Sequence, residues 1–206
     1  HGTMSGTIEF YKAAKAAGIK PIIGMEAYVA ARGRADRDPQ KDKARYHLIL
    51  LAMNNTGYRN LMKLSTLANL EGMYYKPRID HELLEQYNEG LIALSACASG
   101  ELGEQLRLDN YAEAKRIASW YKSIFGDRYY LELQDHGHPD CPSKWDVQVK
   151  INQYLEQLSA ELGIECVVSS DGHYLNHADQ DAHEILLCVG TGSYLSDEKR
   201  MTLSYT

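Results

Sequence analysis

Residues 166–174 read CVVSSDGHY, a short apolar run that ends in Asp-x-His. The run predicts a buried strand that gives way to Asp171 and His173. In an extended chain, residues two positions apart point to the same side, so the carboxylate of Asp171 and the imidazole of His173 would converge on one point. Both groups are common metal ligands. Alone, the pattern also fits a capping aspartate and a surface histidine, so matching ligands on other strands decide between these interpretations.

The composition is that of a single acidic domain. The chain has 206 residues, with 22 basic and 28 acidic side chains and a net charge of −6. Because non-specific affinity for nucleic acid comes mainly from Lys and Arg, such a domain would need a metal or a neighbouring domain to bind DNA. Four cysteines without a C-x-x-C pair argue against a zinc knuckle or a disulfide framework and favour a reducing, cytoplasmic setting. No segment predicts a membrane span or a secretory signal.

Apolar runs that predict strands alternate with amphipathic stretches that predict helices. The predicted strands are 19–29, 46–53, 90–97, 128–133 and 164–169. The predicted helices are 7–17, 55–70, 82–87, 99–108, 110–125, 142–162 and 178–188. This alternation predicts an α/β fold with a parallel sheet, in which function lies at the carboxyl ends of the strands. The polar, charge-mixed residues 31–45 predict a mobile loop, with phosphate binding as the alternative.

Metal-capable side chains recur at or near the ends of the predicted strands. The candidate ligands are His1, Glu26, His47, Cys97, Asp171 and His173. Taken singly, Glu26 fits a surface carboxylate, His47 a satisfied core histidine and Cys97 a small buried hydrophobe. Several such residues at one end of a sheet favour a hydrolytic site with more than one metal.

The chain resembles the PHP (polymerase and histidinol phosphatase) domain at the front of bacterial DNA polymerase III alpha subunits. The resemblance runs over nearly the whole chain and rests, in order, on HGTMSGTIEFYKAAKAAGIKPIIGMEAYVA, YHLILLAMNNTGYRNLMKL, EGMYYKPRID, GLIALSACASGEL, YYLELQDHG, SSDGHYL and DAHEILLCVGTG. It implies an α/β fold, the PHP-type distorted (β/α)7 barrel, which we expect to be incomplete at its N-terminus. We expect this domain over residues 1–190 and a linker or tail over 191–206 that leads toward a polymerase core.

The resemblance also implies a site with up to three divalent metals, for which we expect zinc, manganese or iron. Six residues match ligand positions of the family: His1 in Asp-His-Gly, Glu26 in Gly-x-Glu, His47 in the His-Leu strand, Cys97 in Leu-Ser-x-Cys, and Asp171 and His173 in Asp-x-His. Glu26, Asp171 and His173 are the expected catalytic residues. Two departures stand out. Residues 170–172 read Ser-Asp-Gly where the family commonly has Asn-Asp-Val, and the family's upstream strands, with three further ligands, do not precede His1. We therefore expect this chain alone to bind metal weakly or not at all.

The resemblance implies a role in DNA replication, in a parent protein that is a DNA-directed DNA polymerase (a nucleotidyltransferase). The site would be a metal-dependent phosphoesterase or 3′→5′ exonuclease that acts on a DNA 3′ end. Lys76, Arg78 and His136 are candidate substrate contacts, with exposed loop charge as the alternative for Lys76 and Arg78. A second possibility is a structural module without catalysis that scaffolds the polymerase core or docks a proofreading subunit. A third, a stand-alone phosphatase, fits the YYKPRID and QDHG segments poorly.

Overall fold

The computed structural model describes residues 1–135 and 142–202. At the centre of the described part is a seven-stranded sheet with the order β3-β4-β1-β2-β5-β6-β7. The strands are β1 (Gly24–Ala30), β2 (Arg45–Ala52), β3 (Met73–Tyr74), β4 (Lys76–Ile79), β5 (Leu91–Leu94), β6 (Tyr129–Gln134) and β7 (Cys166–Ser169). The α-helices are α1 (Thr7–Ala16), α2 (Asn55–Leu70), α3 (His81–Tyr87), α4 (Glu101–Arg107), α5 (Tyr111–Phe125), α6 (Pro142–Leu162) and α7 (Gln180–Thr191).

The sheet is mixed, so the prediction of an all-parallel sheet was wrong. β2 runs antiparallel to both β1 and β5, whereas β5, β6 and β7 are parallel to one another. Residues 31–44 between β1 and β2 form no helix. Without a crossover helix the chain turns back directly, and an antiparallel pair results. The first residues of β2 therefore lie beside the last residues of β1. They are on the side of the sheet where the carboxyl ends of β5, β6 and β7 also lie.

The predicted α/β organisation and its long helices are confirmed. α2 begins as a capped helix, because Oδ1 of Asn54 accepts a hydrogen bond from the backbone N–H of Gly57 at 3.0 Å. β1 is shorter than predicted and begins only at Gly24. The sequence did not predict the short hairpin of β3 and β4, although β4 pairs in parallel with β1 and so extends the sheet.

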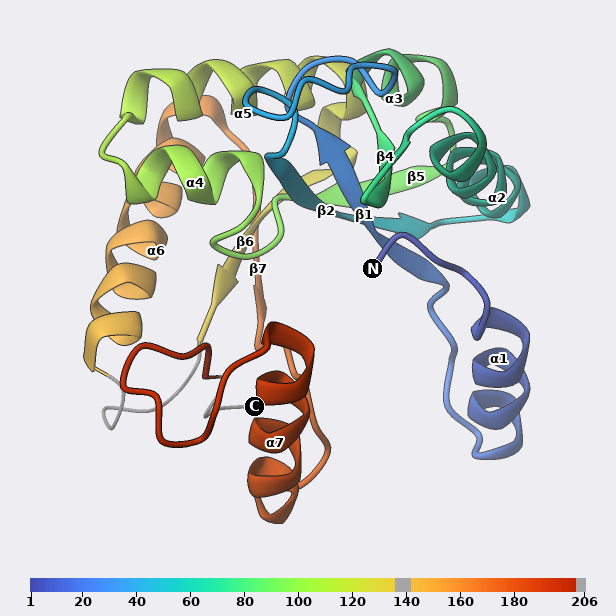
Figure 1. The fold of residues 1–206 in the computed structure, drawn as a ribbon. Coiled ribbons are helices and arrows are strands. Elements are labelled where there is room, and N and C mark those ends of the chain that lie inside the picture. Colours follow the sequence, from blue (N-terminus) through green and yellow to red (C-terminus); the bar gives the residue numbers. More distant parts are fainter. Residues whose placement is uncertain (136–141, 203–206) are drawn as a thin grey trace.

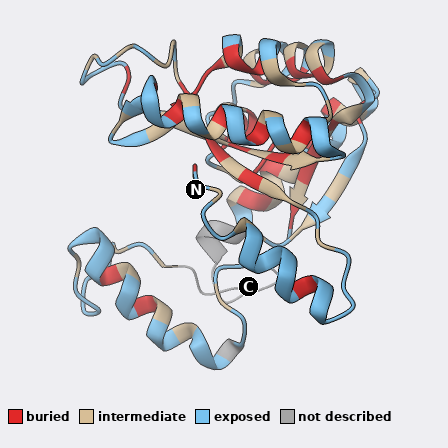
Figure 2. Ribbon diagram, turned by 90° about the vertical axis from the view of Figure 1, so that its right-hand side faces the viewer, coloured by how far each residue is buried: buried red, intermediate tan, exposed pale blue. Residues whose placement is uncertain are grey.

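The hydrophobic core lies on the outer side of the curved sheet, where α2 to α6 wrap around it (Figure 1; buried residues are red in Figure 2). Leu48 and Leu50 of β2 are buried on this side, and His47 alternates with them, so it faces the inner side. Tyr28 pairs with His47, and Glu26 precedes Tyr28 by two residues. Glu26, Tyr28 and His47 therefore share the inner face of the sheet.

The sheet is open rather than closed into a barrel, with β3 and β7 at its two edges among the described strands. α1 and α7 lie apart from the main helical layer (Figure 1). Ala14 is the one buried residue of α1, which is described in full, while Ile8 and Phe10 are exposed. Over the described residues, no helix combines the length and the apolar character that crossing a membrane requires.

Candidate metal centre

Three side chains meet on the inner face of the sheet. Oε1 of Glu26 lies 2.9 Å from Nε2 of His1 and 3.0 Å from Nδ1 of His47. The three ligand atoms of this group lie within 4.8 Å of one another. The backbone N–H of Gly2 donates to the carbonyl oxygen of Glu26 at 2.7 Å, which holds His1 against β1. The segment before α1 and two antiparallel strands thus bring two imidazoles to one carboxylate.

Cys97 adjoins this group from the end of β5. Its Sγ atom lies 3.3 Å from Nδ1 of His47, and the backbone N–H of Ser99 donates to the same sulfur at 3.4 Å. The backbone N–H of His47 donates to the carbonyl oxygen of Ser99 at 3.0 Å, so the segment after β5 is tied to the start of β2. Imidazole nitrogen, carboxylate oxygen and cysteine sulfur together are the donor set of zinc and related first-row metals.

The protonation of these groups reflects their mutual contacts. Burial opposes the charged form of Glu26, but hydrogen bonds from His1 and His47 outweigh it and lower the pKa of Glu26 to about 2. The hydrogen bond to Glu26 raises the pKa of His1. Burial raises the pKa of the Cys97 thiol to about 11. A cation that took these ligands would have to displace protons from His1 and Cys97, because metals bind the deprotonated forms.

Asp171 lies within electrostatic range of the same group. After the hydrogen bond to Glu26, the charge of Asp171 also contributes to the raised pKa of His1, and it adds to the effect of burial on Cys97. Asp171 has φ of 51°, a left-handed conformation that aspartate adopts more readily than most residues. His173 instead lies beside His183, with ring centroids 5.9 Å apart. Among the described contacts His173 has none with His1, Glu26 or His47, so its role as a ligand stays a prediction.

The candidate substrate contacts differ in their surroundings. Lys76 of β4 is exposed, and its charge acts on His1 against the raised pKa, so it lies near the metal-ligand group. Arg78 is 1% exposed. Its guanidinium donates to the carbonyl oxygens of Gly72 (3.1 Å), Asp42 (3.3 Å), Arg34 (2.9 Å) and Asp36 (2.8 Å). Arg78 therefore holds the 31–44 loop, and a phosphate contact at Lys76 stays a prediction. His136 lies outside the described residues.

Ion pairs fasten the loop that the sequence predicts to be mobile. Arg32 makes a two-pronged contact with Asp42, from Nε to Oδ1 at 2.8 Å and from Nη2 to Oδ2 at 2.7 Å. Arg34 pairs with Asp80 at 3.0 Å and also with Glu71 and Glu82, both at 2.8 Å. Both arginines are thus engaged by carboxylates, which does not support the phosphate-binding alternative for this loop.

Tyr28 is a neighbour of the site that sequence reasoning missed. Its ring stacks on His1 with centroids 5.4 Å apart and an interplanar angle of 19°, and it meets His47 edge-on at 5.4 Å. A tyrosine in a strand is ordinary, so its type carried no signal. The antiparallel register that pairs it with His47 could have identified it, but the predicted parallel sheet did not contain that pair.

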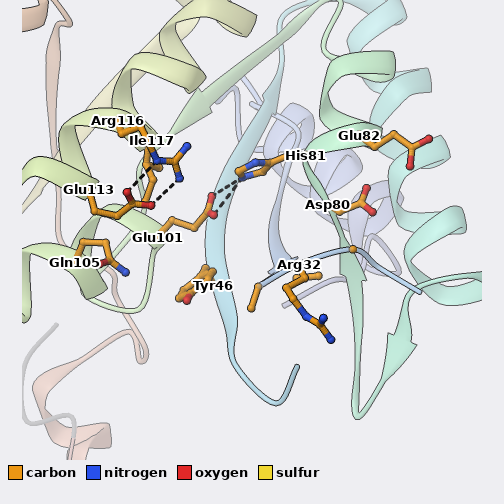
Figure 3. A pocket seen from close by; sticks show the side chains of 13 residues that line it. Arg32, Tyr46, Asp80, His81, Glu82, Glu101, Gln105, Glu113, Arg116 and Ile117 are labelled. Carbon is orange, nitrogen blue, oxygen red and sulfur yellow. Dashed lines mark hydrogen bonds and ion pairs between the residues drawn. The ribbon is translucent and has the colours of Figure 1, made fainter. Parts of the chain in front are cut away.

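A pocket of about 440 Å³ lies between Tyr46 of β2 and helices α3, α4 and α5 (Figure 3). Nε2 of His81 lies 3.0 and 3.1 Å from the two carboxylate oxygens of Glu101, which also accepts a hydrogen bond from the hydroxyl of Tyr121. Arg116 and Glu113 pair with each other in its wall at 2.6 Å (Figure 3). The charged side chains described in this pocket all have partners, so it offers no unpaired charge to a ligand.

Comparison with known proteins gives a consistent result. Residues 1–136 match the PHP domain family. The chain is 45% identical over 204 residues to the DNA polymerase III subunit alpha of Borreliella burgdorferi, covering 98% of this chain and 17% of that protein. It is 48% identical over 203 residues to that of Treponema pallidum (98% and 17%) and 45% identical over 202 residues to that of Thermus aquaticus (97% and 16%). The chain thus spans about one sixth of the length of these curated relatives.

Proposed function

Because the chain belongs to the PHP domain family, we propose that it is the PHP domain of a replicative DNA polymerase III alpha subunit. The similarity to proteins of that name covers 97–98% of the chain, which supports this assignment over that of a stand-alone phosphatase. We assign the domain to residues 1–190 and a connection toward the polymerase core to residues 191–206. The matched relatives extend far beyond the region that this chain covers. DNA polymerisation would therefore belong to a longer protein that carries this chain.

The chemistry we propose for the domain itself is metal-dependent hydrolysis of a phosphodiester at a DNA 3′ end, a 3′→5′ exonuclease. The observation that carries this proposal is the meeting of His1, Glu26 and His47, with the sulfur of Cys97 against His47. This mixed set of nitrogen, oxygen and sulfur donors fits zinc, manganese or iron. When bound, such metals would supply an activated water and would stabilise negative charge on the phosphodiester oxygens.

The residues of the chain divide this work among them. His1, Glu26, His47 and Cys97 would hold metal, and Asp171 would add a second carboxylate from the end of β7, followed by His173. Lys76 would contact a substrate phosphate, since its charge lies near His1. The domain carries a net charge of −6, so affinity for DNA would have to come from the metals and from the rest of the polymerase.

A structural role is the second candidate, and one observation favours it. α1 and α7 expose large apolar side chains, among them Ile8 (56%), Phe10 (53%), Leu186 (67%) and Val189 (78%). Exposed apolar side chains that gather on one helix are typical of a surface that another domain or another protein covers. The remainder of the polymerase or a proofreading subunit would be the partner. This role and a metal site are compatible in one domain, so the test must measure metal and nuclease activity directly.

The test uses the full-length protein that carries this chain and a single-stranded DNA with a labelled 3′ end. We expect label release that a chelator abolishes and that added Mn²⁺ or Zn²⁺ restores, together with bound metal in elemental analysis. His47→Ala should lose both the metal and the release of label. His81→Ala is the matched control and should keep both, because His81 also contacts a glutamate, Glu101, but in the pocket beside α3, α4 and α5. A wild-type protein with neither metal nor nuclease activity would leave the structural role as the function.

A further inference from the structure

A buried polar cluster lies on β6, in the same sheet as the candidate metal centre. Glu132 and Gln134 are 5% and 2% exposed. Oε1 of Glu132 accepts hydrogen bonds from the hydroxyl of Ser169 and from Nε2 of Gln134 (3.3 Å). The backbone N–H of Glu132 donates to Oγ of Ser95 at 2.8 Å. Glu132 thus joins the segment after β5, through its backbone N–H, to the last residue of β7, through its carboxylate.

The register of the sheet places this cluster on the face of the metal ligands. Glu26 pairs with Ile49, Ile49 with Leu94, and Leu94 with Tyr130, so these four side chains share the inner face. Glu132 follows Tyr130 by two residues and faces the same way. Glu26 and Glu132 are therefore on the same side of one sheet, on different strands.

Ser169 connects the cluster to the ligand-bearing end of β7. It precedes Asp171 by two residues, and its carbonyl oxygen accepts the backbone N–H of Asp135 at 3.1 Å. Among the described strands, β7 pairs only with β6. The described backbone hydrogen bonds include none from residues 170–174. On the N-terminal side, the position of Asp171 therefore depends on how firmly Ser169 is held. On the C-terminal side, the rings of His173 and Tyr174 lie near that of His183.

Burying the carboxylate of Glu132 has a cost in folding free energy, although it holds a strand in place. Oε2 of Glu132 and Oε1 of Gln134 are buried without a described partner. Burying polar atoms without partners is unfavourable, and well-packed apolar side chains often replace buried charges without loss of stability. An apolar residue at position 132 could support β6, but it could not accept a hydrogen bond from Ser169.

We propose that Glu132 is a positioning residue of the metal centre, which acts through Ser169 to fix the end of β7 that presents Asp171. This inference rests on the proposed function in so far as Asp171 is a metal ligand. The arrangement is that of an outer-shell partner, which orients a ligand without touching the metal and whose loss weakens metal binding.

The test compares Ser169→Ala and Glu132→Met with Ser159→Ala in the full-length protein. Ser159 is a matched control, because its hydroxyl donates to the carbonyl oxygen of Ile164 at 2.6 Å, just before β7 begins. Amide hydrogen exchange of peptides covering residues 166–171 is measured without metal, and Mn²⁺ affinity is measured by calorimetry. We expect Ser169→Ala and Glu132→Met to speed exchange at the end of β7 and to weaken Mn²⁺ binding by about 10–100-fold. Ser169→Thr, which keeps a hydroxyl, should retain the wild-type exchange rate and the wild-type Mn²⁺ affinity.

The possible results distinguish a failure of the positioning role from a failure of the proposed metal function. Unchanged exchange at the end of β7 in both Ser169→Ala and Glu132→Met would overturn the positioning role. Equal effects of Ser159→Ala on Mn²⁺ affinity would also overturn it, because any support of β7 would then suffice. If the wild-type protein binds no Mn²⁺ but Ser169→Ala and Glu132→Met still speed exchange, the hold on β7 stands and the proposed metal function fails.

Discussion

Nδ1 of His47 lies 3.0 Å from Oε1 of Glu26, although His47 stands near the start of its strand. The antiparallel direction of β2 makes this contact possible, because it pairs His47 with Tyr28, two residues beyond Glu26. In an all-parallel sheet the start of β2 would lie at the amino ends of the strands. It would then be far from Cys97, which follows the carboxyl end of β5. The mixed sheet thus explains why a residue that opens one strand joins residues that follow others.

Replacing Glu26 should weaken metal binding more than replacing an exposed carboxylate does. Glu26→Gln removes the charge that both His1 and His47 contact, so we expect Mn²⁺ affinity of the full-length protein to fall by at least the ~10–100-fold typical of outer-shell partners. Calorimetry provides the measurement. Glu85→Gln, an exposed glutamate of α3, is the control. Equal affinities of the two variants would argue against Glu26 as a ligand.

The contact of His1 with Glu26 should make the stability of the metal-free chain depend on pH. The pKa of Glu26 is lowered from 4.5 to about 2, so its contribution is present above pH 4.5 and is lost as the pH falls toward 2. The pKa of His1 is raised above 6.5, so its contribution is present below pH 6.5 and is lost as the pH rises through the raised value. The stability difference between wild type and Glu26→Gln in urea unfolding should therefore be largest between pH 4.5 and 6.5. A difference independent of pH would contradict this coupling.

Replacing Cys97 should change the preference among metals. A thiolate favours Zn²⁺ over harder ions such as Mn²⁺, and a serine hydroxyl does not. We expect Cys97→Ser to lose more affinity for Zn²⁺ than for Mn²⁺ in competition titrations. Cys166→Ser, at an exposed cysteine of β7, should leave the ratio of the two affinities as in the wild type. An unchanged ratio in Cys97→Ser would remove the sulfur from the ligand set.

Substitutions of Lys76 and Arg78 should affect different properties, DNA binding for Lys76 and stability for Arg78. Arg78→Met removes the side-chain donor of four backbone carbonyl oxygens, of which, among the described hydrogen bonds, only that of Gly72 keeps one, from the backbone N–H of residue 78. We therefore expect a loss of about 2–4 kcal/mol in stability and faster proteolysis within residues 31–44. Lys76→Ala should leave proteolysis unchanged and weaken binding of DNA 3′ ends by roughly tenfold, since one exposed phosphate contact is lost. Weaker DNA binding in a well-folded Arg78 variant alone would reverse these roles.

The sequence predicted the helices well because their signals are local. α6 begins at the predicted proline and ends before Gly163, which has φ of 62°, and α2 has a side-chain cap at its first turn. Strand direction is not local. The strand patterns of β1 and β2 read the same in either direction, and only the absence of a helix in residues 31–44 reveals the antiparallel return.

The candidate site was predictable in its residue types but less so in its surroundings. His1, Glu26, His47 and Cys97 stood out as metal-capable residues near strand ends, and the structure brings them together. Arg78 did not stand out as a buried residue, because arginines are mostly exposed and its carbonyl partners lie up to 44 positions away in the sequence. Glu132 was missed for a similar reason, since its partner Ser169 is 37 positions away.

The most direct test of the central claim is the nuclease activity of Asp171→Asn in the full-length protein, assayed beside DNA polymerisation. The substitution keeps the shape of Asp171 and removes the charge that acts on His1 and Cys97. If this domain holds a hydrolytic metal site, metal-dependent release of a labelled 3′ nucleotide should vanish while polymerisation persists. Retention of the wild-type release rate in Asp171→Asn would contradict the account.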